Sequence, residues 1–148
     1  MTKPKIKQAA EPKVSGKLRP APVCEQYLSF SFRYFTNNSA YSIDALPTGN
    51  EREKTLSSLH RRLEELSCQS WLHWSQQRKS TGLETVPYQS LHFKAKDDGR
   101  LFKDTDIYVF RFDTYKGSNK GRILGFKDGS CAILHIIGYD FDFSAYNH

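Results

Sequence analysis

Apolar and polar residues alternate along two stretches of this chain, residues 27–35 (YLSFSFRYF) and 106–113 (DIYVFRFD). Successive side chains of a β-strand point to opposite faces, so a period of two is typical of a strand. In the second stretch one face carries aromatic residues, and Arg111 shares the other face with Ile107 and Val109. Both stretches are predicted to be strands, and the second places a cation in the middle of an apolar face.

A β-hairpin is predicted near the C-terminus, where residues 121–126 and 131–139 flank the turn sequence KDGS. An Asp-Gly pair between two apolar runs favours a tight turn, because glycine tolerates positive φ. The run CAILHII in the second strand is almost wholly apolar, which is typical of a strand buried on both faces. Residues 86–95 are a further candidate strand, weakened at the start by Pro87.

A helical period replaces the alternation in residues 51–66. Four leucines recur there at spacings of three and four, and so share one helix face: Leu56, Leu59, Leu63 and Leu66. Residues 70–79 are predicted to form a second short helix, with Trp71 and Trp74 on one face. Two tryptophans at this spacing favour core packing over a ligand platform.

The predicted order is therefore one strand, two helices and three or four consecutive strands. Helices grouped ahead of a run of strands are typical of an α+β domain. We expect an antiparallel sheet with a two-helix hairpin packed on one face, forming a single domain over residues 23–148. Residues 1–22 contain six basic side chains, one acidic side chain and no aromatic residue, so we expect a disordered basic tail.

Charge is distributed unevenly between these two parts. The chain carries a net charge of +6, but outside residues 1–22 only 16 basic side chains face 15 acidic ones. The folded part is close to neutral, unlike a typical nucleic-acid-binding domain. The basic tail either contacts nucleic-acid phosphates or acts only as a solubilising leader, and the sequence leaves both open.

Cysteine usage and hydropathy point to a cytoplasmic protein. The three cysteines are widely spaced and form no CxxC pattern, which argues against a disulfide scaffold and against a zinc site. No apolar segment resembles a signal peptide, and none approaches the roughly 18–20 residues of a membrane span. Without an HExxH motif or a tight His/Cys cluster, we expect no metal and no cofactor.

General acid–base chemistry on RNA is the remaining candidate, because the sequence contains neither a GxSxG motif nor a glycine-rich phosphate loop ahead of a helix. Attack by a 2′-hydroxyl needs a base, cations for the developing charge and an acid for the leaving oxygen. Arg111 in mid-strand and Arg122 at a strand start supply cations. Tyr146 and His148, expected on an exposed C-terminal tail, supply proton-transfer groups.

The segments DIYVFRFD, GRILGFKDG and AILHIIGYDFDFSAY, in this order, resemble the RelE/HigB-like toxin superfamily of bacterial toxin–antitoxin systems. The resemblance covers residues 27–148 and implies an endoribonuclease that cuts mRNA, often on the ribosome, and is neutralised by an antitoxin. Its catalytic positions correspond to Arg111, Arg122 and Tyr146, with His148 as an addition. Lys120 and Lys127 are predicted to bind the nucleic acid.

Asp140 and Asp142 favour a different class of function. Members of the family often carry a second arginine just after the final strand, whereas these two carboxylates would repel a phosphate there. The alternative is a non-catalytic module of phage, plasmid or defence origin that binds a basic protein partner. A third possibility is a nucleic-acid-binding protein that uses its basic tail.

Overall fold

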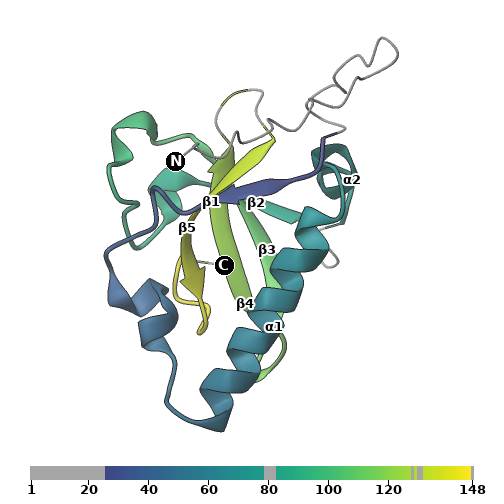
Figure 1. The fold of residues 1–148 in the computed structure, drawn as a ribbon. Coiled ribbons are helices and arrows are strands. Elements are labelled where there is room, and N and C mark those ends of the chain that lie inside the picture. The colour runs from purple at the N-terminus through teal and green to yellow at the C-terminus, as the bar shows by residue number, and fades with distance from the viewer. Residues whose placement is uncertain (1–25, 79–82, 128, 130–131, 148) are drawn as a thin grey trace, which may run out of the picture.

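The protein is an α+β fold built on a five-stranded mixed sheet (Figure 1). The computed structural model describes residues 26–78, 83–127, 129 and 132–147. The predicted basic tail, residues 1–22, lies outside the described residues, as does His148. None of the helices in the described part of the chain combines the length and apolar character needed to cross a membrane.

The sheet has the strand order β1-β5-β4-β3-β2. Its strands are β1 (Ser29–Ser31), β2 (Leu83–Pro87), β3 (Asp106–Thr114), β4 (Gly117–Lys127) and β5 (Ile133–Asp140). The three pairings among β2, β3, β4 and β5 are antiparallel, and β1 pairs with β5 in parallel. The prediction of an α+β domain is confirmed, but the prediction of a purely antiparallel sheet is wrong at the β1 edge.

The parallel edge has a topological reason. β1 and β5 are separated in the chain by both helices and three strands, and a parallel pair needs such a long connection. The alternation in residues 27–35 indicates which residues share a face, but it carries no information on the neighbouring strand or its direction. Only three of these residues enter the ladder.

The strand predicted for residues 86–95 corresponds to β2 (Leu83–Pro87), which both begins and ends earlier than predicted. Pro87 is its last residue, and the chain then turns through a short 3₁₀ segment, Tyr88–Ser90. Proline lacks the backbone N–H that a ladder needs, which accounts for this end point. The earlier start brings Glu84 into the sheet, opposite Val109 of β3.

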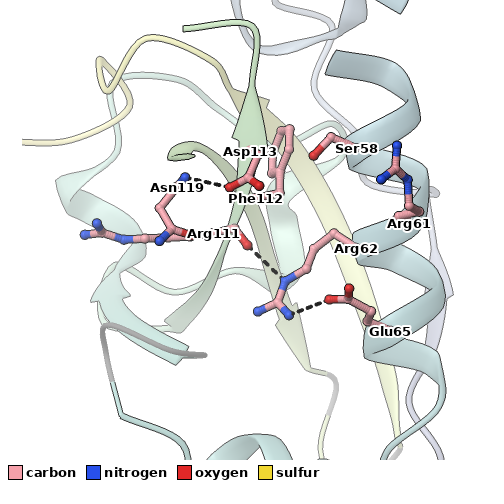
Figure 2. Close-up of a pocket in the computed structure, with 8 residues that line it drawn as sticks. All are labelled: Ser58, Arg61, Arg62, Glu65, Arg111, Phe112, Asp113 and Asn119. Atoms are coloured by element: carbon pink, nitrogen blue, oxygen red, sulfur yellow. Dashed lines mark hydrogen bonds and ion pairs between the residues drawn. The ribbon is translucent and has the colours of Figure 1, made fainter. Parts of the chain in front are cut away.

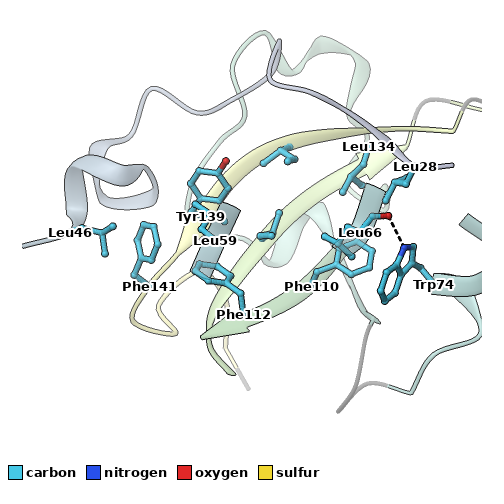
Figure 3. Packing of buried hydrophobic residues seen from close by; sticks show 12 residues of the cluster. Leu28, Leu46, Leu59, Leu66, Trp74, Phe110, Phe112, Leu134, Tyr139 and Phe141 are labelled. Atoms are coloured by element: carbon cyan, nitrogen blue, oxygen red, sulfur yellow. Dashed lines mark hydrogen bonds between the residues drawn. The ribbon is translucent and has the colours of Figure 1, made fainter. Parts of the chain in front are cut away.

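Helix α1 (Asn50–Ser67) and the short helix α2 (Trp71–Ser75) cover one face of the sheet. Leu59 and Leu66 of α1 are buried against this face, and the indole Nε1 of Trp74 donates to the Leu66 carbonyl at 2.9 Å (Figure 3). Ser70 begins α2 by accepting a hydrogen bond from the His73 N–H. The packing role predicted for Trp74 is confirmed.

The opposite face of the sheet is covered mainly by irregular segments. Buried residues on this side come from the strands, from the loops that precede α1 and β3, and from the C-terminal segment: Tyr34, Tyr41, Phe93, Ala95, Ile107, Val109, Leu124, Phe126, Ile137, Ala145 and Tyr146. We call residues 141–147 the C-terminal segment. It lies back over the sheet, and this placement forms the candidate site.

Candidate functional site

Two arginines lie opposite each other on the face of the sheet that carries the C-terminal segment. Arg111 of β3 and Arg122 of β4 are register partners in the antiparallel ladder. Like charges in directly opposed positions repel each other, so such a pair requires acidic partners. Two carboxylates on the outer neighbours supply them. Arg111 Nη2 lies 3.6 Å from Glu84 Oε2 of β2, and Arg122 Nη1 lies 3.3 Å from Asp140 Oδ2 of β5.

Asp140 also holds the C-terminal segment in place. Its Oδ1 accepts hydrogen bonds from the N–H groups of Asp142 at 3.3 Å and Ser144 at 3.1 Å, and its Oδ2 accepts from the Ala145 N–H at 3.1 Å. Burial raises the pKa of Asp140, while these backbone donors oppose the shift. One buried carboxylate therefore connects the arginine on β4 with the turn that directs the chain back.

Two aromatic rings enclose the guanidinium of Arg122. Its Cζ lies 4.1 Å from the ring centroid of Phe143 and 4.4 Å from that of Tyr146, within the range of cation–π attraction. The Arg122 side chain has no exposed surface. Burial lowers the pKa of Arg122, and the neighbouring Tyr146, Asp140 and Glu84 counteract that effect. Arg122 is thus a buried cation with acidic and aromatic partners.

Tyr146 and Glu84 are hydrogen-bonded to each other beside the two arginines. The Tyr146 hydroxyl donates to Glu84 Oε2 at 3.0 Å, and the same oxygen faces Arg111. Burial raises the pKa of Tyr146 well above its usual value of 10, so the phenol is protonated at neutral pH. Glu84 is an acceptor, Tyr146 is a donor, and two guanidinium groups stand beside them. Together these groups can bind an anion and move a proton.

Four of the six residues predicted from the sequence lie in or beside this cluster. Arg111, Arg122 and Tyr146 belong to it, and the Lys120 Nζ lies 5.6 Å from the Phe143 ring centroid. Lys127 stands apart, with its Nζ 4.2 Å from the ring centroid of Trp71. His148 lies outside the described residues.

The surroundings of two C-terminal residues differ from the prediction. Tyr146 was expected on an exposed tail, but it is only 4% exposed. Asp140 was expected to be available to a basic partner or to repel a phosphate, whereas it is fully buried and bonded to Arg122. In both cases the hydrogen bonds of Asp140 bring the segment onto the sheet, a long-range effect that the local sequence does not reveal.

Glu84 is absent from the residues predicted from the sequence, because β2 begins at Leu83, three residues before the predicted strand of residues 86–95. The sequence does contain a signal for Glu84, because it is an acidic residue among the strand-favouring residues Leu83, Thr85 and Val86. In a strand over these residues, the Glu84 side chain would lie on one face of the sheet. Its side chain is 9% exposed, which is low for a carboxylate and is explained by its bonds to Arg111 and Tyr146.

A groove of about 400 Å³ lies beside the backbone of Arg111, between β3 and α1 (Figure 2). Arg62 of α1 reaches across it, donating from Nε to the Arg111 carbonyl at 2.9 Å and pairing with Glu65 at 3.1 Å. On the opposite wall, Asp113 accepts a hydrogen bond from the Asn119 N–H at 2.8 Å. The acidic groups of the groove are thus engaged within the protein, and the groove is polar.

Comparisons with known proteins add no relative. No protein-family model matches the chain, and neither a curated protein nor a solved structure matches it. Among the residues that the structure describes, no group of three or more His, Cys, Asp or Glu side chains is arranged to hold a metal ion.

Proposed function

We propose that this protein is a RelE-like, metal-independent endoribonuclease that cuts mRNA, with its site at Arg111, Arg122, Glu84 and Tyr146. The proposal depends on one observation: Arg111, Arg122 and Tyr146, which come from β3, β4 and the C-terminal segment, converge on one face of the sheet. The carboxylate of Glu84 lies beside them. The partners implied are mRNA, free or on the ribosome, and a cognate antitoxin in the cytoplasm.

The chemistry assigns one role to each group. Glu84 accepts the proton of a ribose 2′-hydroxyl, whose oxygen attacks the adjacent phosphorus. The guanidinium groups of Arg111 and Arg122 stabilise the charge that develops on the phosphate oxygens. The P–O5′ bond breaks, the Tyr146 hydroxyl donates a proton to the leaving oxygen, and a 2′,3′-cyclic phosphate remains. His148, two residues after Tyr146, is a second proposed proton donor.

The hydrogen bond between Tyr146 and Glu84 supports these roles. The two groups are 3.0 Å apart, so the proton that Glu84 takes up can return to the Tyr146 oxygen after the reaction. The arrangement regenerates both groups without another titratable residue. It also requires the bond to be given up while substrate is present, because both groups then face the RNA.

Substrate access begins at Arg111. This side chain is 28% exposed, whereas Arg122 is fully covered. The Arg111 Nε–H is buried and has no acceptor within the described part of the chain, so it retains hydrogen-bonding capacity for a phosphate oxygen. The exposed Lys120 stands at the same rim. RNA would meet these two cations first.

The complete burial of Arg122 and Asp140 favours a second function, a non-catalytic binding module. A fully buried and bonded ion pair is also a structural device that holds the C-terminal segment to the sheet. In this alternative the cluster stabilises the fold, and only Arg111 and Lys120 contact an RNA or protein partner. The two functions differ in whether a phosphodiester bond is broken.

The test uses end-labelled mRNA, with and without ribosomes, and three forms of the protein: wild type, Arg111→Ala and Arg33→Ala. Arg33 is an exposed arginine outside the cluster, so its substitution removes the same charge elsewhere. We expect wild-type cleavage with 2′,3′-cyclic phosphate ends, a loss on the order of 100-fold in Arg111→Ala, and activity within about twofold of wild type in Arg33→Ala.

Equal cleavage by wild type and Arg111→Ala would contradict the assigned site. Absence of cleavage by wild type on both free and ribosome-bound mRNA would contradict the nuclease proposal. If wild type then still binds RNA and Arg111→Ala does not, the binding module is the correct function.

A further inference from the structure

The Phe143 ring lies over three cations at once. Its centroid is 4.1 Å from Arg122 Cζ, 5.8 Å from Arg111 Cζ and 5.6 Å from Lys120 Nζ. The ring is half-buried, while Arg122 beneath it is fully buried. Phe143 is therefore the outer layer over the arginine pair, and its removal would open one face of the Arg122 guanidinium.

We propose that Phe143 is a gate over an anion-binding site formed by Arg111, Arg122 and Lys120. The ring occupies the site in the free protein, leaves it when a phosphodiester of single-stranded RNA enters, and then stacks on an adjacent base. The identity of the anion rests on the proposed ribonuclease function, but the covered cation site does not.

The backbone at Phe143 is strained in a way that suits a movable residue. Its φ is +59°, in the left-handed region that phenylalanine rarely adopts. The strain is maintained from both sides, because Asp140 accepts hydrogen bonds from the N–H groups of Asp142 and Ser144. Release of residue 143 from this conformation would recover energy that partly offsets the loss of the ring's contacts with the cations.

The ring is not part of the hydrophobic interior. Within the described residues, neither of the two core clusters includes Phe143, although Ala145 and Tyr146, two and three residues later, belong to one of them. A movement of the ring therefore displaces no member of either cluster. Residues 145 and 146 remain as the fixed end of the segment, and Phe143 is the part able to turn outward.

Electrostatics favours exchange of the ring for a phosphate. The face of an aromatic ring attracts a cation through its quadrupole, which is a weaker interaction than a charge-assisted hydrogen bond to a phosphate oxygen. A displaced phenylalanine is also suited to stack on a nucleobase without regard to sequence. The same residue thus shields Arg122 from water before binding and stacks on RNA afterwards.

The test measures binding of inorganic phosphate by the Nε–Hε NMR signals of Arg111 and Arg122 in wild type and in Phe143→Ala. We expect Phe143→Ala to bind phosphate at least about tenfold more tightly and to shift the Arg122 signal, because the cover is gone. Phe102→Ala, which removes a 73% exposed phenylalanine elsewhere, is the matched control and should leave the affinity unchanged. Arg111→Ala combined with Phe143→Ala should abolish the gain.

Unchanged or weaker phosphate binding by folded Phe143→Ala would overturn the gate. If that variant does not fold, the measurement is made on wild type with labelled phenylalanine, titrated with a single-stranded RNA oligonucleotide. Saturable movement of the Phe143 ring signals supports the gate, and unmoved signals overturn it. Tighter phosphate binding without RNA cleavage by any form would keep the gate and reject the nuclease. Cleavage together with unchanged phosphate affinity in Phe143→Ala would reject only the gate.

Discussion

The guanidinium of Arg122 and the carboxylate of Asp140 lie 3.3 Å apart, and neither side chain is exposed to solvent. They are register partners on β4 and β5, so the sheet itself sets their separation. Through the backbone donors of residues 142, 144 and 145, the same carboxylate fixes the C-terminal segment. This single pair joins the sheet, the segment and the candidate site.

The Arg122–Asp140 pair should be strongly coupled in stability. Removing one partner leaves a buried charge, so Arg122→Met should lower the free energy of unfolding by about 3–5 kcal/mol. In a double-mutant cycle with Asp140→Asn, measured by urea denaturation, we expect a coupling energy above about 1 kcal/mol. The control cycle is Arg62–Glu65, whose carboxylate is 62% exposed and whose coupling should stay below about 1 kcal/mol. Equal coupling in the two cycles would contradict this assignment.

Tyr146 should act as a proton donor over the whole usual pH range. Burial raises its pKa above 10, although Arg122 opposes the shift, so no loss of activity between pH 6 and 9 should come from this group. Tyr146→Phe removes only the hydroxyl and should lower kcat by roughly 100- to 10,000-fold with little change in KM. Tyr27→Phe, at a 71% exposed tyrosine, is the control. A kcat for Tyr146→Phe within about twofold of wild type would exclude the proposed role.

Alkaline pH should destabilise the fold through Tyr139. Burial raises the pKa of this phenol from 10 to about 12, so the folded state keeps its proton when the unfolded state has lost it. The stabilisation is complete below pH 10 and is lost as the pH rises through about 12. Between pH 10 and about 12, the free energy of unfolding of the wild type should decrease, and that of Tyr139→Phe should decrease by about 2 kcal/mol less, because the variant lacks the phenol. Urea denaturation at a series of pH values measures both. Parallel pH curves for the two proteins would disprove the link.

Gly121 makes room for the ring of Phe112. A Cβ at this position would lie 2.5 Å from Phe112 Cζ, closer than any normal contact. Gly121→Ala should therefore destabilise the protein by about 1–3 kcal/mol, as expected for overpacking of a core. Gly99→Ala introduces a methyl group into open space and serves as the matched control in the same thermal denaturation. Equal melting temperatures for the two variants would contradict this prediction, because they would mean that β3 and β4 shift apart at Gly121 with little loss of stability.

Local patterns predicted the elements on which the fold is built. The period of two in residues 106–113 placed Arg111 on the correct face of β3, and the leucine spacing in residues 51–66 located α1. These features depend on neighbours one to four residues apart, which a single sequence displays directly. The Asp-Gly turn likewise indicated that β4 and β5 are antiparallel neighbours.

The sequence alone was enough to predict most of the helices and strands, the face of α1 that packs on the sheet, and three residues of the candidate site, Arg111, Arg122 and Tyr146. Three features became visible only in the folded structure: β1 pairs in parallel, Glu84 joins the arginines, and Asp140 and Tyr146 are buried. The physical reason is that burial and charge pairing depend on partners contributed by distant strands. Arg122, Glu84 and Tyr146 meet because the sheet aligns β2, β3, β4 and β5, and no local period encodes that alignment.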